Sequence, residues 1–320
     1  MTIENDEKKH CPRCKSKQVK LNGKTKQGKQ RYQCLLCKRT YIWKQEKRIE
    51  ARRYQWFNQW LLEGFTIKQI ANLQGVSRST VSRVINYWLK QEPPKRKEFK
   101  DVEYVILDGT YINRRVGIYV IMDGRSKEVI YGDYGISETG KHLERLYSKL
   151  QEEGLKPFSA TVDGSLQQLK YLVQAWNGLI IQRCIVHIHR QGLSWLRRNP
   201  KSREAQKLRE ILMVLLYIRA KEDAENFIKS FRSWEDRYGL KLRRSTNRGK
   251  VFGDILRTRS MIINALPYMF NYLEDPGIPK TTNALEGYFG RLKQKYRLHR
   301  GLSQQKRRAF FRWYFYLKPY

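Results

Sequence analysis

Four cysteines near the N-terminus constrain the chain more tightly than any other feature of its sequence. Cys11, Cys14, Cys34 and Cys37 form two C-x2-C pairs separated by nineteen residues. In each pair the backbone amides can point at the thiolates, and two such pairs complete the tetrahedral four-sulfur set that suits zinc. A disulfide framework is the alternative, but it does not suit a chain of the reducing cytosol. We therefore predict a small zinc ribbon over residues 1–45, with structural Zn²⁺ and no open position for catalysis.

The charge balance indicates a polyanionic partner. The chain has 65 Lys+Arg against 30 Asp+Glu, a net charge of +35, and nucleic acid is the default partner for such a charge. An apolar fraction of 40% with 12% aromatics excludes a disordered basic tail. No apolar run approaches the roughly 20 residues that cross a bilayer, and the first ten residues lack the apolar stretch of a signal peptide. We expect a soluble, cytoplasmic, nucleoid-associated protein with no membrane partner.

Residues 46–92 have the pattern of an all-α DNA-binding domain. Thr66 can cap a short helix, Gly75 stands where the chain must turn sharply, and Ser77 can cap a second helix. The second helix would bury an apolar stripe and expose a polar and basic set. That set is Arg78, Ser79, Thr80, Ser82 and Arg83. The arrangement resembles the helix-turn-helix of bacterial DNA-binding proteins, with the exposed set facing the major groove. An ordinary helical hairpin is the alternative.

From residue 101 the pattern changes from helix to strand, after a charged, proline-containing linker over residues 93–100. The expected elements are strands at 102–112, 114–123 and 127–136, a helix at 137–153, a strand at 159–164, a helix at 166–176 and a strand at 179–186. Three antiparallel strands followed by parallel strands added through helices are similar in order to an RNase H-like core. We predict an α/β RNase H-like catalytic domain over residues 101–320, with a helical insertion at about 190–280.

Two aspartates fall where a carboxylate is costly to bury. Asp108 shares its strand face with Tyr104 and Ile106, and Asp163 ends a later strand just before Gly164. In the expected strand order the first and fourth strands are neighbours, so both carboxylates could project to one site. Buried carboxylates need positive partners, and Mg²⁺ (or Mn²⁺) prefers such oxygen ligands and promotes phosphoryl transfer. The alternative for each residue is an ordinary turn aspartate in an Asp-Gly pair.

The third carboxylate of the expected site is Glu286. With Asn283 it could form a capping box, which is the structural alternative. The helical pattern that follows places Glu286, Lys293 and Arg297 on one face, beside a buried apolar stripe. A glutamate at the head of a basic track fits a metal ligand next to DNA phosphates, which Lys293 and Arg297 would contact. Gly290 on this face would permit the close approach of a backbone.

These motifs together resemble a DDE transposase of the bacterial insertion-sequence and Mutator-like group. The matching segments are VILDGTY around Asp108, TVDG around Asp163, the Cys184-x-x-His187 pair, and TTNALEGYFGRLK around Glu286. The resemblance implies that the three acids are catalytic and bind two divalent ions, with a helical insertion between the second and the third. It also implies that Cys184 and His187 support the site. A packed cysteine beside a hydrogen-bonded histidine is the alternative for this pair.

The expected function is DNA transposition. The ribbon and the helix-turn-helix would bind double-stranded DNA at the terminal inverted repeats of an insertion sequence, and the catalytic domain would cleave it and transfer a strand to target DNA. Joining two ends implies a homodimer or a higher oligomer. Two alternatives remain: a zinc-ribbon, helix-turn-helix regulator that binds DNA without catalysis, and an RNase H-like nuclease that cuts without joining. Trp234 in the insertion is expected in the core rather than as a base-stacking wedge.

Overall fold

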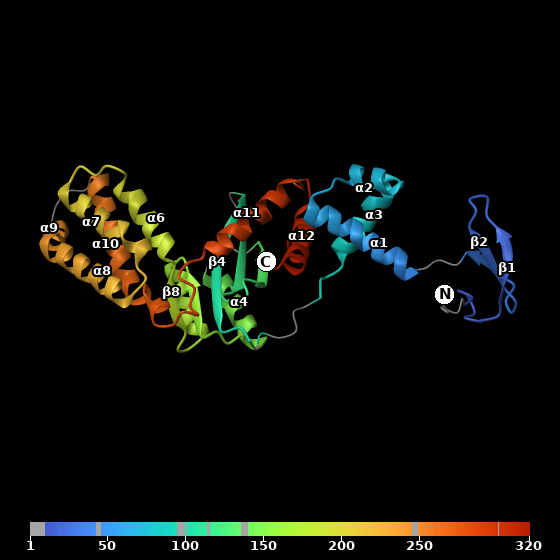
Figure 1. Ribbon diagram of the computed structural model, residues 1–320, viewed down its shortest axis with the longest axis horizontal. Coiled ribbons are helices and arrows are strands. Elements are labelled where there is room, and N and C mark those ends of the chain that lie inside the picture. Colours follow the sequence, from blue (N-terminus) through green and yellow to red (C-terminus); the bar gives the residue numbers. More distant parts are fainter. Residues whose placement is uncertain are drawn as a thin grey trace. The chain divides into compact units, whose positions relative to one another are not determined.

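A computed structural model describes residues 10–42, 46–94, 99, 101–113, 116–135, 140–244, 249–299 and 301–320. The chain forms two compact units (Figure 1). The first runs to Trp88 without the segment Leu61–Gly64, and the second combines that segment with Leu89–Tyr320. Most of the predicted linker, residues 95–98 and 100, lies outside the described residues.

The N-terminal ribbon is a three-stranded antiparallel sheet in the order β1-β2-β3. Its strands are β1 (Val19–Lys24), β2 (Gln30–Cys34) and β3 (Thr40–Ile42). Each C-x2-C pair is followed by a lysine with positive φ, Lys15 at 58° and Lys38 at 59°, so the two cysteine turns repeat one backbone geometry. Gly28, with φ of 77°, forms the turn between β1 and β2. The predicted ribbon is confirmed.

A helical segment follows the ribbon: α1 (Glu46–Asn58), a π-helical turn (Gln59–Glu63), α2 (Ile67–Gln74) and α3 (Arg78–Lys90). Thr66 caps α2 in a capping box, because its Oγ1 accepts from the N–H of Gln69 at 3.2 Å and its own N–H donates to Gln69 Oε1 at 2.8 Å. Gly75 ends α2 in the left-handed region at φ 60°, which a side chain would disfavour. The predicted caps and turn are therefore confirmed.

Helix α3 presents the predicted side chains to solvent. Val81, Val84 and Ile85 are buried. Arg78, Ser79 and Arg83 are exposed, and Thr80 and Ser82 are partly exposed. Ser77 Oγ accepts from the N–H of Thr80 at 3.3 Å, as expected for the cap. The helix thus has one apolar and one polar, basic side.

The second unit is built on a five-stranded mixed sheet in the order β6-β5-β4-β7-β8. Its strands are β4 (Tyr104–Asn113), β5 (Val116–Asp123), β6 (Val129–Tyr134), β7 (Ser159–Val162) and β8 (Ile180–Arg183). The first three pair antiparallel, whereas β4–β7 and β7–β8 pair parallel. The predicted neighbour relation of the first and fourth strands is confirmed.

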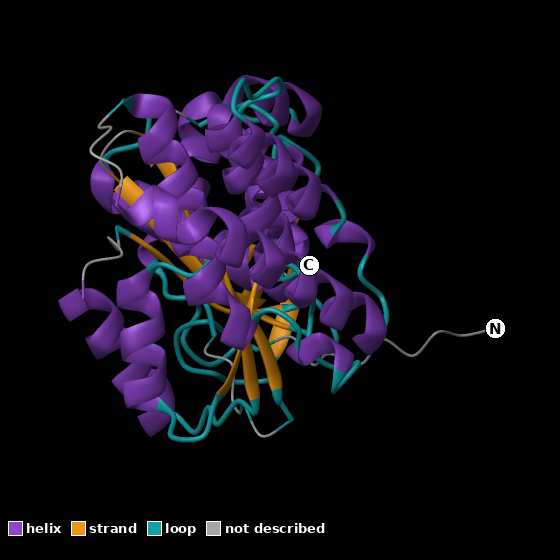
Figure 2. Ribbon diagram, turned by 90° about the vertical axis from the view of Figure 1, so that its left-hand side faces the viewer, coloured by secondary structure: helices purple, strands orange, loops and turns teal. Residues whose placement is uncertain are grey.

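Helices pack on both faces of this sheet, whose strands run between them in Figure 2. One face packs against α4 (Gly140–Glu152) and α5 (Leu166–Ala175), with Leu107, Tyr119 and Tyr147 in the shared core. The other face meets α11 (Asn283–Arg297) and α12 (Gln304–Leu317), which lie against β4 and β6. The first residues of the helix predicted at 137–153 lie outside the described residues, and its end at Glu152 agrees with the prediction. Asp108 belongs to the α11 face, because its neighbours Leu107 and Val105 point to the opposite core.

The predicted last strand, 179–186, is too long. The strand ends at Arg183, and α6 (Ile185–Leu196) begins two residues later. The apolar run suits a strand as far as Arg183, but Ile185, Ile188 and Leu196 are buried at helical spacing in a second core. Cys184, predicted on this strand, is instead the cap residue of α6, and His187 lies in the first turn of that helix.

The insertion is helical, as predicted, but it begins at α6 instead of near residue 190. It continues with α7 (Arg203–Met213), α8 (Lys221–Trp234), α9 (Leu240–Arg244) and α10 (Lys250–Ala265), gathered beyond β8 in Figure 1. Trp234 is 3% exposed and its indole N–H donates to Glu204 O at 2.9 Å, which confirms its predicted place in the core. No helix in the described part of the chain is long and apolar enough to cross a membrane.

The packing of α12 on β6 can be tested at Gly132. A methyl group there would lie 2.6–2.7 Å from ring atoms of Phe315, whose side chain is buried, so Gly132→Ala should cost about 1–3 kcal/mol of unfolding free energy through overpacking. The control is Gly253→Ala in α10, where a Cβ meets no atom within 4 Å and the change should be neutral or slightly stabilising. Urea denaturation measures both. Equal midpoints for the two variants would contradict the packing.

Candidate functional site

The four N-terminal cysteines form a zinc site of the ribbon. Their sulfur atoms all lie within 4.8 Å of one another, with Cys11 and Cys37 at 3.5 Å and Cys14 and Cys34 at 3.6 Å. Four sulfurs about 2.3 Å from a central zinc would be separated by about 3.8 Å, so the cluster fits a tetrahedral site. The backbone N–H of Cys14 is the main cause that lowers the pKa of Cys11 to about 6, which favours the thiolate that zinc requires.

The two predicted aspartates lie on the same face of the central sheet at the same level. In the parallel β4–β7 pair, Ile106 is opposite Thr161. Asp108 and Asp163 each come two residues later, so they extend on the same face, Asp108 from within β4 and Asp163 just after the end of β7. Asp108 is 9% exposed, and its Oδ1 accepts from the N–H of Gly109 at 2.8 Å. It lies within β4, so the turn alternative for Asp108 is wrong.

Asp163 does stand in a turn, where its Oδ1 accepts from the N–H of Ser165 at 3.1 Å. The next residue, Gly164, has φ of 92°, and a Cβ there would lie 1.7 Å from Nε of Arg183. The buried guanidinium of Arg183 thus packs directly over Gly164. Burial lowers the pKa of Arg183, and the nearby Asp163 carboxylate acts to raise it. Only glycine fits this turn, which places Asp163 beside a buried cation.

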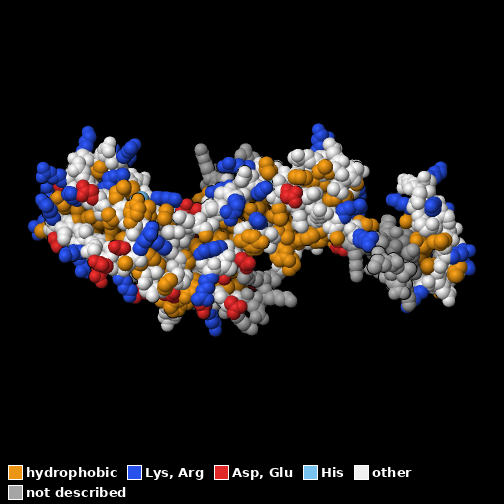
Figure 3. All heavy atoms as spheres, viewed as in Figure 1, with side chains coloured by type: hydrophobic (Ala, Val, Ile, Leu, Met, Phe, Trp, Pro, Cys, Tyr) orange, Lys and Arg blue, Asp and Glu red, His pale blue; other side chains and the backbone are white. Residues whose placement is uncertain are grey.

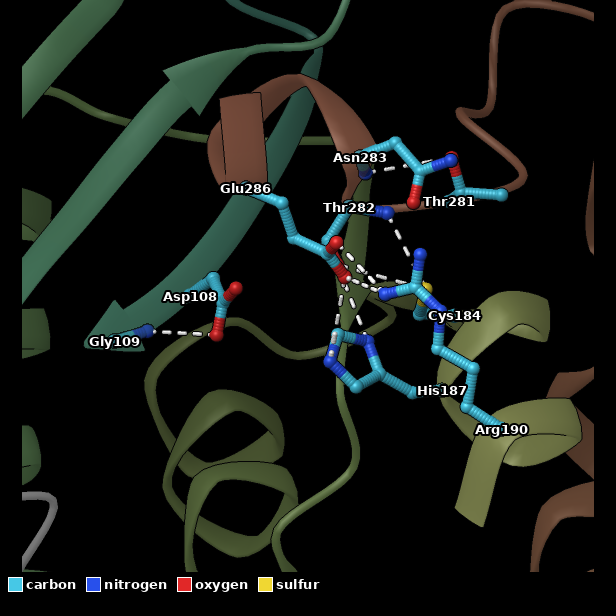
Figure 4. A network of polar contacts seen from close by, with 9 residues as sticks. All are labelled: Asp108, Gly109, Cys184, His187, Arg190, Thr281, Thr282, Asn283 and Glu286. Carbon is cyan, nitrogen blue, oxygen red and sulfur yellow. Dashed lines mark hydrogen bonds and ion pairs between the residues drawn. The ribbon is translucent and has the colours of Figure 1, made fainter. Parts of the chain in front are cut away.

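Glu286 enters from α11 and contacts α6 (Figure 4). Both of its carboxylate oxygens accept from Nη1 of Arg190, at 2.9 and 2.8 Å. His187 Nε2 lies 3.7 Å from Glu286 Oε1. Thr282 occupies the cap position of α11, and the N–H of Asn283 donates to Thr281 Oγ1 instead. The capping-box alternative for Glu286 is therefore wrong.

The Cys184–His187 pair ties the start of α6 to the start of α11. The backbone N–H of Thr282 donates to Cys184 Sγ at 3.3 Å, and the Thr282 hydroxyl lies 3.3 Å from His187 Nδ1. Burial acts to raise the pKa of Cys184, but the hydrogen bonds with His187 and Thr282 outweigh it and lower that pKa. The hydrogen bond with Cys184 is the main cause that raises the pKa of His187 to about 9, and the negative charges of Asp108 and Asp163 act in the same direction. The predicted pair thus lies next to all three acids.

The carboxylate oxygens of Asp108, Asp163 and Glu286 do not come close enough together to bind one ion. Among the described residues, which include all three acids, only the cysteine cluster brings three or more ligand atoms within 4.8 Å of one another. Figure 4 shows Glu286 directed at His187 and Arg190, with Asp108 to one side. The hard oxygen donors suit Mg²⁺ or Mn²⁺, and the cations His187, Arg183 and Arg190 surround them in this arrangement.

The predicted basic track on α11, formed by Lys293 and Arg297, is partly buried. Lys293 is half-buried and donates to Thr110 Oγ1 at 2.5 Å, whereas Arg297 is exposed. A Cβ at Gly290 would meet no atom within 4 Å, so the predicted close approach of a backbone does not occur within the described part of the chain. Figure 3 shows Lys and Arg side chains well in excess of Asp and Glu over the visible surface.

Arg183, Arg190 and Thr282 belong to the site but were not predicted from the sequence. A helical interpretation of residues 185–196 would have found Arg190, because it lies one turn after His187 and on the same face. Arg183 and Thr282 carry no local signal. They reach the site through strand pairing and through the return of the chain after the insertion.

Fold and site together define a basic α/β protein with a zinc ribbon, a helical insertion and two aspartates on one face of neighbouring parallel strands. Comparison with family profiles identifies the zinc ribbon of the InsA N-terminal domain over residues 8–38 and the Mutator family of transposases over residues 40–300. The chain belongs to the Mutator transposase family. A search of curated proteins found no match.

Zinc content can be tested with the fifth cysteine as the control. The wild-type protein should contain about one zinc per chain, and Cys34→Ser should lose it because three thiolates bind zinc far more weakly than four. Cys184→Ala removes a cysteine outside the cluster and should leave the zinc content unchanged. Elemental analysis of the purified proteins measures this. Loss of zinc from both variants would contradict the assignment.

Ionisation of His187 gives a second test. Its pKa of about 9 in the folded, metal-free protein lies above the ordinary value of 6.5. The stability that it contributes is thus complete below pH 6.5 and is lost as the pH rises through 9. NMR titration of the ring should find a midpoint near 9 that falls in Cys184→Ala. His189 on the same helix is the internal control, because burial lowers its pKa. A His187 midpoint below that of His189 would refute the assignment.

Proposed function

We propose that this transposase binds the ends of an insertion sequence through its ribbon and helical segment, and cleaves and transfers DNA strands with Asp108, Asp163 and Glu286. The observation that carries this proposal is the register of β4 against β7, which aligns the two aspartates on the face that α11 covers. The sheet order β6-β5-β4-β7-β8, with three antiparallel strands followed by two parallel ones, supports an RNase H-like fold for the catalytic domain.

Each acid has a distinct place in the proposed chemistry. Asp108 from β4 and Asp163 from the end of β7 would hold divalent ions, and Glu286 would complete the ligand set from α11. Mg²⁺ or Mn²⁺, when bound, supplies Lewis-acid activation of the attacking oxygen and of the scissile phosphate. Without bound ions the pKa of His187 is raised to about 9, mainly by its hydrogen bond with Cys184, and in this form His187 would offset the carboxylate charge or donate to a phosphate oxygen. Strand transfer exchanges one phosphodiester for another and needs no nucleotide cofactor.

DNA recognition is assigned to α3. Arg78, Ser79 and Arg83 are exposed on a helix that follows a capped helix and a tight glycine turn, which is the geometry of a helix-turn-helix. The ribbon would contribute phosphate contacts from its lysines, which position the protein but do not specify sequence. The exposed Arg297 would extend the phosphate contacts along α11 toward the cleavage site.

The catalytic assignment is tested by removing one charge at a time. Asp108→Asn, Asp163→Asn and Glu286→Gln should each slow cleavage of end DNA by at least about 100-fold and leave end binding intact. The control is Asp123→Asn, at a turn where asparagine can still accept the N–H of Arg125. Radiolabelled oligonucleotides monitor cleavage and joining together. Wild-type protein that cleaves but never joins a 3′-OH to target DNA would favour a nuclease, and no cleavage by any form would favour a DNA-binding regulator.

Recognition by α3 is tested through the salt dependence of binding. Arg78→Ala and Arg83→Ala should each weaken binding to the terminal repeats. If the replaced arginine binds a phosphate, the plot of the logarithm of the binding constant against the logarithm of the salt concentration should become less steep by about one. Replacing an arginine that reads a base should instead lower the preference for the repeats over unrelated DNA of equal length. Fluorescence anisotropy measures both. Unchanged affinity and preference in both variants would exclude α3 as the recognition helix.

A further inference from the structure

The ion pair between Arg190 and Glu286 leaves the acid site incomplete. One guanidinium nitrogen, Nη1, donates to both carboxylate oxygens at 2.9 and 2.8 Å. Glu286 therefore faces α6, and the three acids do not converge within the span of one ion among the described residues. Because a cation beside a carboxylate repels a second cation, Glu286 cannot serve fully as a metal ligand while this pair persists.

This pair is more exposed than the Arg259–Glu235 ion pair of the insertion. The Arg190 side chain is 60% exposed and that of Glu286 is 32% exposed. The Arg259–Glu235 pair in the insertion, by contrast, has side chains 15% and 23% exposed. Exposed ion pairs are weak because water competes for both partners, so the Arg190 pair can open at little cost. Its position at the site, with an exposed guanidinium, fits exchange better than structural support.

If Arg190 separated from Glu286, its guanidinium would be placed to contact DNA. Arg190 lies one helical turn after His187, beside Glu286, which the proposed function makes a ligand of the ions that act on the scissile phosphate. The planar fork of arginine binds phosphate as well as carboxylate, with two parallel hydrogen bonds in each case. One side chain can thus exchange a carboxylate of the protein for a phosphate of the substrate without a change in chemistry.

We propose that Arg190 is an exchangeable counter-ion, which holds Glu286 toward α6 while the site lacks divalent ions and passes to a DNA phosphate when Glu286 turns to join Asp108 and Asp163. This inference rests on the proposed function, in which Glu286 is a metal ligand. It makes assembly of the acid site depend on both the ion and the substrate. Premature cleavage of DNA outside the assembled complex would thereby be disfavoured.

The first test measures Mn²⁺ affinity of the full chain without DNA, by electron paramagnetic resonance. Arg190→Gln should bind Mn²⁺ about 2- to 5-fold more tightly, because the competing ion pair is removed. The matched control is Lys207→Gln, which removes the same charge from an exposed pair with Glu210 in the insertion and should change nothing. Unchanged affinity in a folded Arg190→Gln, checked by circular dichroism, would overturn the proposal.

A double-mutant cycle tests whether Arg190 affects Mn²⁺ binding through its ion pair with Glu286 or only by repelling the ion with its positive charge. If Arg190 acts through Glu286, Arg190→Gln should give no gain in Mn²⁺ affinity in a Glu286→Gln background. A gain that persists there would show that Arg190 only repels ions, and would overturn the proposal. The cycle also distinguishes failure of the exchange from failure of the proposed function. If Glu286→Gln alone leaves Mn²⁺ affinity unchanged, the metal-ligand role of Glu286 fails. If it lowers affinity and Arg190→Gln has no effect, only the exchange fails.

The second test measures binding to end DNA with and without Ca²⁺, used as a divalent ion that is not expected to support cleavage. Arg190→Gln should weaken binding several-fold, and reduce the salt slope by about one, only when Ca²⁺ is present. Without the ion, Arg190 is held by Glu286 and its removal should leave affinity unchanged. Equal weakening in both conditions would identify a permanent phosphate contact and overturn the exchange.

Discussion

The parallel pairing of β4 with β7 is the constraint on which the site depends. Ile106 and Thr161 are opposite each other, so the residues two positions later, Asp108 and Asp163, extend from the same face of neighbouring strands. A slip of one residue would turn one aspartate into the core of Leu107 and Tyr119. The apolar residues that alternate with the acids therefore set the register, and the register places the chemistry.

Electrostatic compensation explains how the fold tolerates the acids. Three cations surround them: Arg183 packs over Gly164, His187 holds its proton to a pKa of about 9, and Arg190 pairs with Glu286. Of the three acids Asp108 is the most buried, at 9% exposed, and an uncompensated carboxylate there would cost several kcal/mol. In the proposed function the same cations would oppose the binding of divalent ions, because like charges repel.

Much of this protein could be predicted from its sequence because the signals are local. The cysteine spacing predicts the ribbon, the caps at Thr66 and Ser77 predict the helices around Gly75, and periodicity predicts the succession of strands and helices along the chain. The pairing of the first and fourth strands follows from the similarity to an RNase H-like core. The prediction was wrong where an apolar run suits two structures: the last strand stops at Arg183 and a helix takes up Ile185. That error hid Arg190, since its helical relation to His187 was not visible. The catalytic, DNA-binding and oligomeric assignments remain proposals.

The sequence by itself determined the zinc ribbon, the polarity of α3 and the succession of strands along the chain, because each depends on residues close together in the chain. Only the tertiary structure decided which cations meet those acids. Glu286 and Arg190 are 96 residues apart, and Thr282 is 98 residues from Cys184. These contacts form when the helical insertion returns the chain to the start of α6. Periodicity carries no information about such a return, because it depends on how whole helices pack.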